Sequence, residues 1–384
     1  MSWPEQVVRV QSLSESGLRA IPVQYIKPLS ERPLFKPGSQ FHRHVDVPLI
    51  DLQHLFGKDP NLHLDTLNRI STACRDWGIF QAVNHGVSHK LMTKARQVWR
   101  DFFNLPLQVK QEYANAETTY EGYGSRLGVE KGAVLDWSDY FFLHYLPISL
   151  RNQSKWPEQP SSCREVVAQY GCEVVKLCRT LQKAMSIDLG LKEEYIENAF
   201  GGDYMGACFR ANFYPKCPQP ELTLGLSSHS DPGGITILLP DYDVARLQVL
   251  NHGDWITVNP VPDSLIVIIG DQIQVPIVGS PPPFLYKYWY SIYCICVYLI
   301  QVVSNAIYNS VEHRVTVNSA KDGVSLAMFF NPKSDLVIEA AEELVSEERP
   351  ALYEAMTFDH YRVHMRTKGP CGKKRLESLK FNTS

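Results

Sequence analysis

The chain has 384 residues, enough for one large domain or two ordinary ones, and 44% of them are hydrophobic, as in globular proteins. A formal net charge of -3, from 41 acidic and 38 basic residues, argues against nucleic acid as a partner. Nine cysteines without regular spacing, and an N-terminus without an apolar stretch, favour a reduced cytoplasmic protein over a secreted, disulfide-bonded one.

The first half of the chain predicts mainly helices with short strands between them. We divide it into a polar lead-in (1–44), an N-terminal region (45–160) and a helical connector (161–204). Helices are predicted where apolar residues recur at helical spacing, and strands where short apolar runs stand between turn residues. The expected helices are 64–78, 88–106 and 165–185, and the expected strands are 47–55 and 79–87. The apolar stripes of these helices indicate core packing rather than a cofactor site.

From residue 205 the pattern changes to short strands at close spacing. The β-branched and aromatic runs are "ACFRANFY", "ITILL", "RLQVL", "WITVNP", "LIVIIG", "VEHRVTV" and "VSLAMFF", and "VLNHGDWI" predicts a hairpin. So many short strands favour a sandwich or small barrel, and a jelly roll fits their number. We therefore predict a jelly-roll domain over 205–334, followed by a C-terminal helix and tail over 335–384.

A possible metal site lies in "GLSSHSDPGGITILL" (225–239), where His229 and Asp231 stand two residues apart. Side chains at i and i+2 of an extended chain point to the same face, so both could hold one ion. His313 is the best candidate for a third ligand, because it too lies on a predicted strand. Two histidines and one carboxylate leave metal sites open for a co-substrate and O₂, as in non-haem iron(II) oxygenases. Asp231 could instead cap the turn that follows it, and "HRH" at 42–44 is better interpreted as solvated chain.

Six motifs resemble, in the same order, those of the plant 2-oxoglutarate- and Fe(II)-dependent dioxygenases. They are "WGIFQAVNHGV" (77–87), "NFYPKCPQPE" (212–221), "GLSSHSDPGGITILL" (225–239), "IGDQIQV" (269–275), "SNAIYNSVEHRV" (304–315) and "VSLAMFFNPKSD" (324–335). The match covers about residues 45–370 apart from one segment. The resemblance implies a mixed α+β fold whose core is a double-stranded β-helix (jelly roll) with helices packed in front. It also implies Fe(II), with 2-oxoglutarate and O₂ as co-substrates and ascorbate as the expected reductant.

The same resemblance implies roles for individual residues. Iron would be held by His229, Asp231 and His313, with no catalytic residue beyond these metal ligands. The family's Asn-x-Tyr motif falls on Asn212 and Tyr214, which would contact 2-oxoglutarate together with a later serine. The implied reaction is oxidative decarboxylation of 2-oxoglutarate to succinate, coupled to hydroxylation of an unactivated C–H bond.

Within that family, the segments 119–147 and 357–370 are most similar to the jasmonate-induced oxygenases, which hydroxylate jasmonic acid and so damp defence signalling. The resemblance implies a substrate pocket with cationic and aromatic residues: Arg210, Arg362 and Arg366 for the carboxylate, and Phe358, Phe142 and Phe329 as apolar walls. Arg362 and Arg366 are four residues apart on a predicted helix and can reach one side of it. Guanidinium groups suit a small carboxylate. The alternative for this pair of arginines is a solvated helix face. The alternative for the substrate is that of a flavonoid oxygenase, whose planar molecule would favour aromatic stacking.

One position departs from the family pattern. The family binds the distal carboxylate of 2-oxoglutarate with an Arg-x-Ser pair, and here Ser325 is present but Gly323 stands at the arginine position. A buried carboxylate without its partner costs roughly 2–5 kcal/mol. Lys321 could compensate only after a local rearrangement. The chain could therefore be a jelly roll that binds a small carboxylate without turning it over.

A second departure is the segment 276–302, "PIVGSPPPFLYKYWYSIYCICVYLIQV", which separates two motifs that adjoin in the family. It is apolar over membrane-spanning length, yet an anchor there would have to leave and re-enter a barrel between adjoining strands. We therefore expect no membrane partner. With nucleic acid already excluded by the net charge, the expected partner is a small carboxylate. The tripeptide "IQV" occurs at both edges of the segment, which favours a translated retained intron over a genuine lid. Splice signals in the genomic sequence would test this interpretation.

Overall fold

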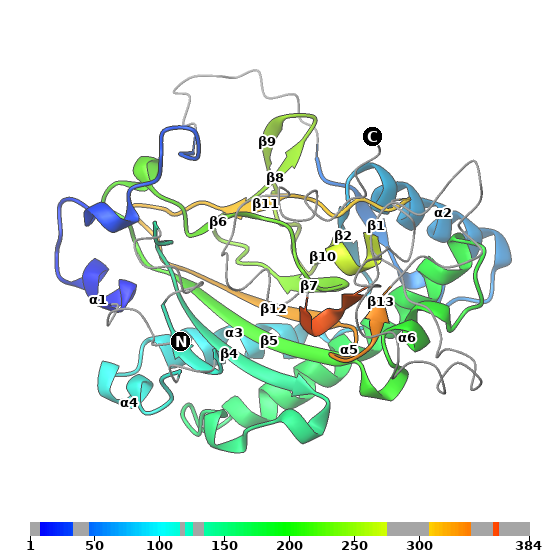
Figure 1. Cartoon of the computed structure of the whole chain (residues 1–384), viewed down its shortest axis with the longest axis horizontal. Coiled ribbons are helices and arrows are strands. Elements are labelled where there is room, and N and C mark those ends of the chain that lie inside the picture. The colour runs from blue at the N-terminus through cyan, green and yellow to red at the C-terminus, as the bar shows by residue number, and fades with distance from the viewer. Residues whose placement is uncertain are drawn as a thin grey trace, which may run out of the picture.

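The structure, a computed structural model, describes residues 8–33, 46–115, 120–125, 134–274, 307–338 and 356–360. Two β-sheets face each other at its centre, and the long helices cover the outer side of the larger sheet (Figure 1). The predicted jelly roll with helices packed in front of it is confirmed.

Over the described ranges, the larger sheet has eight strands in the order β1-β2-β10-β7-β12-β5-β4-β3. They are β1 (Leu49–Asp51), β2 (Ile79–Val83), β3 (Gly122–Gly124), β4 (Asp139–Leu146), β5 (Gly206–Tyr214), β7 (Ile235–Leu239), β10 (Leu265–Ile269) and β12 (Gly323–Asn331). Strands β5 and β12 pair antiparallel over their whole length, with Gly323 opposite Tyr214 and Ser325 opposite Asn212. This register brings the two motifs that were predicted to bind 2-oxoglutarate side by side.

In the described part of the chain, the smaller sheet has four strands in the order β6-β11-β8-β9. They are β6 (Leu226–His229), β11 (His313–Val315), β8 (Leu247–Asn251) and β9 (Asp254–Thr257). The predicted hairpin joins β8 to β9, and its two turn residues, His252 and Gly253, have φ of 49° and 88°. Positive φ at both central residues is the mark of a turn whose twist matches that of the strands.

Among the residues that the structure describes, three long helices and several short ones complete the fold. The α-helices are α1 (Val10–Glu15), α2 (Pro60–Asp76), α3 (His89–Phe103), α4 (Leu107–Gln111), α5 (Cys163–Asp188), α6 (Tyr195–Ala199) and α7 (Asp271–Gln274). Single 3₁₀ turns are Val23–Tyr25, Gln53–Leu55, Ile148–Leu150, Gln153–Lys155, Gly202–Tyr204 and Pro220–Leu222. The Ser88 side chain caps α3 by accepting from the backbone N–H of Leu91, and serine is one of the residue types favoured at that position.

The packing of α3 decides which face of β5 is left for a site. Trp99 of α3 stacks on Phe209, and Phe103 stacks on Phe213, with ring centroids 5.4 and 4.8 Å apart. Because side chains alternate along a strand, these contacts place the odd-numbered residues of β5 against the helices. The even-numbered residues, including Arg210, face the space between the two sheets.

The predicted polar lead-in is described over residues 8–33, and this part packs on the body of the protein. The backbone N–H groups of Val10 and Gln11 each donate to the Asp139 carboxylate at 2.9 Å. Lys27 is 1% exposed and forms a 2.8 Å ion pair with Asp136. Residues 8–33 of the lead-in are therefore part of the fold. The polar composition of the lead-in did not indicate this packing. The "HRH" motif lies outside the described residues.

The C-terminal region returns to the body through β13 (Val337–Ile338), which pairs with β14 (Met356–Thr357). Residues 358–360 are helical, at the start of the predicted C-terminal helix. The rest of that helix and the segment 276–302 lie outside the described residues. Of the helices in the described part of the chain, none is both long and apolar enough to cross a membrane.

Candidate active site

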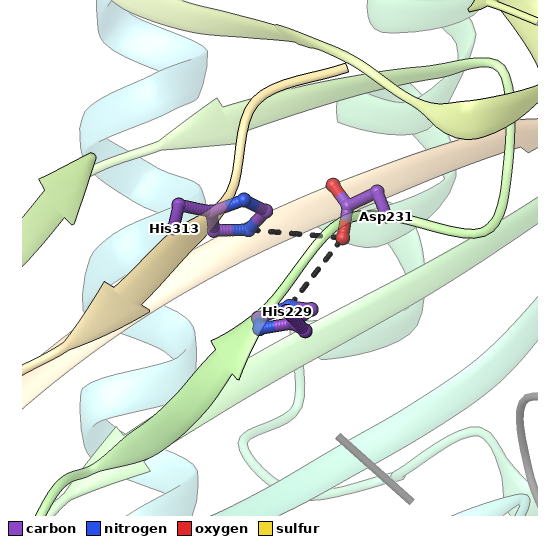
Figure 2. A group of neighbouring side chains, drawn as sticks. All are labelled: His229, Asp231 and His313. Carbon is purple, nitrogen blue, oxygen red and sulfur yellow. Dashed lines mark ion pairs between the residues drawn. The ribbon is translucent and has the colours of Figure 1, made fainter. Parts of the chain in front are cut away.

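Three side chains that the sequence singled out meet between the sheets. His229 ends β6 and His313 begins β11, and the antiparallel pairing of these strands sets the two histidines opposite each other. Asp231 follows in the turn after β6, with its Oδ1 3.5 Å from Nε2 of His229 and 3.8 Å from Nε2 of His313 (Figure 2). One ligand atom of each residue lies within 4.8 Å of the others. This spacing suits a single metal ion held on one face.

Backbone carbonyls fix the orientation of both imidazoles. Nδ1 of His229 lies 2.8 Å from the carbonyl oxygen of Ser227, and Nδ1 of His313 lies 3.1 Å from that of Val311. Because a carbonyl only accepts hydrogen bonds, each Nδ1 carries the proton and donates it. Each Nε2 then keeps its lone pair for a metal, which is the usual arrangement around histidine ligands.

The carboxylate is held in a similar way. Thr236 Oγ1 donates to Oδ2 of Asp231 at 2.5 Å, which leaves Oδ1 for the histidines. Burial raises the pKa of Asp231, but the neighbouring His313 and His229 outweigh burial and bring the pKa to about 2. Burial also lowers the pKa of His313 to about 4, with a further contribution from His229. An ionised carboxylate and a neutral imidazole are the forms that coordinate metal ions.

A cavity of about 670 Å³ adjoins this cluster, a size that fits a small molecule. It contains every predicted 2-oxoglutarate or substrate residue that lies in the described part of the chain. These are Phe142 on β4, Arg210, Asn212 and Tyr214 on β5, Ser325 and Phe329 on β12, and Phe358 after β14. Arg362 and Arg366 lie outside the described residues, so their placement stays a prediction.

Polar groups in the cavity are available to a ligand. Asn212 Nδ2 donates to Ser325 Oγ at 3.3 Å, across the β5–β12 pair. The guanidinium of Arg210 lies over the ring of Tyr140, 4.5 Å from its centroid. Nε of Arg210 is buried and has no hydrogen-bond partner among the described residues. A buried N–H without an acceptor is costly, so this arginine suits a ligand that brings an acceptor.

One arginine of this cavity was not among the residues predicted from the sequence. Arg246 stands directly before β8, is 5% exposed and lines the same cavity. A signal for it was present, because an arginine within the apolar run "VARLQVL" must find a partner if it is buried. Lys321, the cation considered at the sequence level, is exposed instead.

The geometry of the His-Asp-His cluster fits an Fe(II) ion. A double-stranded β-helix with two imidazoles and one carboxylate around one point defines the class of non-haem iron oxygenases, whose iron leaves room for co-substrate and O₂. The donor set is of the kind that Fe(II) accepts, and the unpaired guanidinium N–H groups suit a ligand with carboxylates.

Comparison with known proteins agrees with this class. The family "non-haem dioxygenase in morphine synthesis N-terminal" matches residues 47–159, and the "2OG-Fe(II) oxygenase superfamily" matches residues 205–332. The chain is 52% identical to jasmonate-induced oxygenase 3 of Arabidopsis thaliana over 98% of both chains. It is 33% identical to leucoanthocyanidin dioxygenase of Malus domestica, over 93% of this chain and 94% of that relative.

Among solved structures, the crystal structure of JOX2 in complex with 2OG, Fe and JA covers 99% of both chains, with 51% identity and a TM-score of 0.85. The chain therefore belongs to the 2OG-Fe(II) oxygenase superfamily and, within it, to the jasmonate-induced oxygenases. The resemblance drawn from the sequence motifs is confirmed.

Proposed function

We propose that this protein hydroxylates jasmonic acid with Fe(II) and 2-oxoglutarate, and so lowers the level of the hormone that drives defence signalling. Its similarity to the jasmonate-induced oxygenases supports the substrate class. One observation on this chain carries the proposal: Arg210, with an unpaired Nε–H, lies in an otherwise largely apolar cavity beside the His-Asp-His cluster. A small apolar molecule with one carboxylate matches that environment.

His229, Asp231 and His313 would hold the iron, and Asn212 and Tyr214, with Ser325, would contact 2-oxoglutarate. When bound, Fe(II) and 2-oxoglutarate supply the oxidising chemistry, in which O₂ places one atom in a substrate C–H bond and the other in succinate, with loss of CO₂. Ascorbate would serve to keep the iron ferrous. The protein's own contribution is to bind and orient the substrate and the co-substrate and to exclude water from the site.

Orientation of the substrate falls to Arg210 and the aromatic walls. Charge-assisted hydrogen bonds from Arg210 fix the substrate carboxylate in the cavity, and the Tyr140 ring holds the guanidinium plane. Phe142, Phe329 and Phe358 pack the apolar remainder of the molecule. Holding one C–H bond at a fixed place near the metal is what makes hydroxylation selective. Arg362 and Arg366, on the predicted C-terminal helix, would add further positive charge.

The direct test is turnover by the purified full chain. We expect succinate and hydroxylated jasmonate to form together when Fe(II), ascorbate, 2-oxoglutarate and jasmonic acid are present, with mass spectrometry of both products. A flavanone serves as the competing substrate. Turnover of the flavanone and not of jasmonic acid would instead favour a flavonoid oxygenase. Binding of both ligands without succinate would indicate a silent binding protein.

A variant tests the role of Arg210. We expect Arg210→Gln to raise the KM for jasmonic acid roughly 10- to 100-fold, because a hydrogen bond between charged groups is lost. Methyl jasmonate, which lacks the carboxylate, is the matched control and should bind the wild type and the variant equally poorly. A parallel loss with acid and ester would show that Arg210 does not read the carboxylate.

A further inference from the structure

The position that departs from the family pattern is occupied in space by another residue. Gly323 begins β12, and a Cβ added there would lie 2.3 Å from Nε and 2.9 Å from Cζ of Arg246. The guanidinium of Arg246 therefore fills the space into which a side chain at 323 would project. With Arg246 in this position a side chain at 323 would overlap its guanidinium, so the unexpected glycine and the buried arginine belong together.

Arg246 has donors that the described protein does not use. Its Nη2 donates to the backbone carbonyl of Lys321 at 2.6 Å. Its Nε and Nη1 are buried and have no hydrogen-bond partner among the described residues. The neighbouring Asp241 carboxylate forms its ion pair with Arg100 instead. A guanidinium is always charged and presents five N–H donors. Nε and Nη1 of Arg246 can thus donate to a negatively charged acceptor.

The place of these donors in the cavity identifies the acceptor. Gly323 is the register partner of Tyr214, and Ser325 is that of Asn212, so Arg246 lies at the end of the cavity where the 2-oxoglutarate residues gather. Arg210 is paired with Ala327, four residues further along both strands, about 13 Å away along the backbone. Two guanidinium groups at separate places along one cavity match two carboxylate ligands.

We propose that Arg246, rather than a residue of β12, binds the distal carboxylate of 2-oxoglutarate in this chain. The guanidinium donates from Nε and Nη1 to the carboxylate oxygens, and Ser325 Oγ adds a hydroxyl donor from β12. The arginine thus extends from the residue before β8 to the start of β12, where Gly323 has no side chain. This inference rests on the proposed use of 2-oxoglutarate.

The test measures binding rather than turnover. The Fe(II)-loaded full chain is titrated calorimetrically, without O₂, with 2-oxoglutarate and with 2-oxopentanoate, which has a methyl group in place of the distal carboxylate. We expect the wild type to prefer 2-oxoglutarate by roughly 30-fold or more. Arg246→Leu, which keeps apolar volume in the site, should lose that preference while it binds 2-oxopentanoate as before. Lys321→Ala is the matched control on the neighbouring exposed cation and should bind both compounds like the wild type.

A swap of the two positions separates the inference from a mere loss of folding. Arg246→Gly should lose affinity for 2-oxoglutarate, and Arg246→Gly combined with Gly323→Arg should regain it, because the guanidinium then enters the same space from β12. Equal affinity of the wild type and Arg246→Leu for 2-oxoglutarate would overturn the inference, as would a wild type that does not distinguish the two compounds. If the wild type binds neither compound, the proposed function itself fails.

Discussion

At the scale of single residues, the orientation of His229, Asp231 and His313 depends on groups that are not themselves metal ligands. Two backbone carbonyls orient the imidazoles, and one hydroxyl, that of Thr236, orients the Asp231 carboxylate from the opposite side. Thr236 is 3% exposed and lies on β7, next to the turn that carries Asp231. Such supporting hydrogen bonds tune metal affinity without being ligands.

We therefore expect Thr236→Val to weaken Fe(II) binding roughly 10- to 100-fold. Valine has the shape of threonine but cannot donate to Oδ2, so Asp231 loses its fixed orientation. The affinity is measured by calorimetric titration of metal-free protein with Fe(II) under anaerobic conditions. Thr236→Ser keeps the hydroxyl and should bind iron nearly as the wild type does. A valine variant with unchanged affinity would show that the hydroxyl has no part in holding the carboxylate.

At the scale of elements, the end of β10 supports the turn that carries the carboxylate ligand. The N–H of Gly270 donates to the carbonyl of Gly234 at 2.7 Å, and the N–H of Asp271 donates to that of Asp231 at 2.8 Å. A Cβ on Gly270 would lie 2.3 Å from the carbonyl oxygen of Gly233 and 3.0 Å from that of Asp231. The close approach of two backbones explains why a glycine follows this strand.

We expect Gly270→Ala to lower the free energy of unfolding by about 1–3 kcal/mol and to weaken Fe(II) binding as well. The added methyl group pushes the turn that carries Asp231, since backbone atoms cannot give way as a flexible side chain can. Denaturant unfolding and iron titration measure the two effects. Gly57→Ala is the control, because its nearest atoms are 3.6 Å away. Equal behaviour of the two variants would contradict the steric argument.

At the scale of the whole molecule, both sides of the segment 275–306 are fastened to one core. The Asp271 carboxylate accepts from Ser230 Oγ at 3.1 Å and from Ser310 Oγ at 2.7 Å. The buried Tyr308 donates to Asp188 on α5 at 2.6 Å. The chain before and after this segment is therefore joined through described residues, and the described core needs no contact from 276–302 to bring its two edges together.

We expect deletion of 276–302 to leave the melting temperature unchanged or to raise it, and to increase the soluble yield. A long apolar and aromatic stretch promotes aggregation where it is exposed. Thermal unfolding and the soluble fraction after expression provide the measurements. Replacement of the segment by a Gly/Ser linker of equal length is the control that separates composition from chain length. Loss of folding in both variants would mean that the segment is a structural part of the enzyme.

Sequence periodicity predicted the elements well where each depends only on neighbours along the chain. The strands and the hairpin of the jelly roll, and the cap of α3, follow local patterns that survive in the fold. Helix α2 shows the limit, because it begins at Pro60, capped by Asp59, and not at the predicted start, Leu64, which is 57% exposed. The cap and N1 signals in "KDPN" outweighed the hydrophobic pattern there.

In the candidate site, too, local patterns predicted some features and tertiary contacts determined the others. The sequence by itself determined that His229 and Asp231 share one face, because alternation along an extended chain is a local property. Only the tertiary structure decided that His313 lies opposite His229 and that the guanidinium of Arg246 fills the space above Gly323. Those contacts join strands that are distant in the chain, and the register between paired strands and the packing of two sheets set them. No local pattern of residues encodes either quantity.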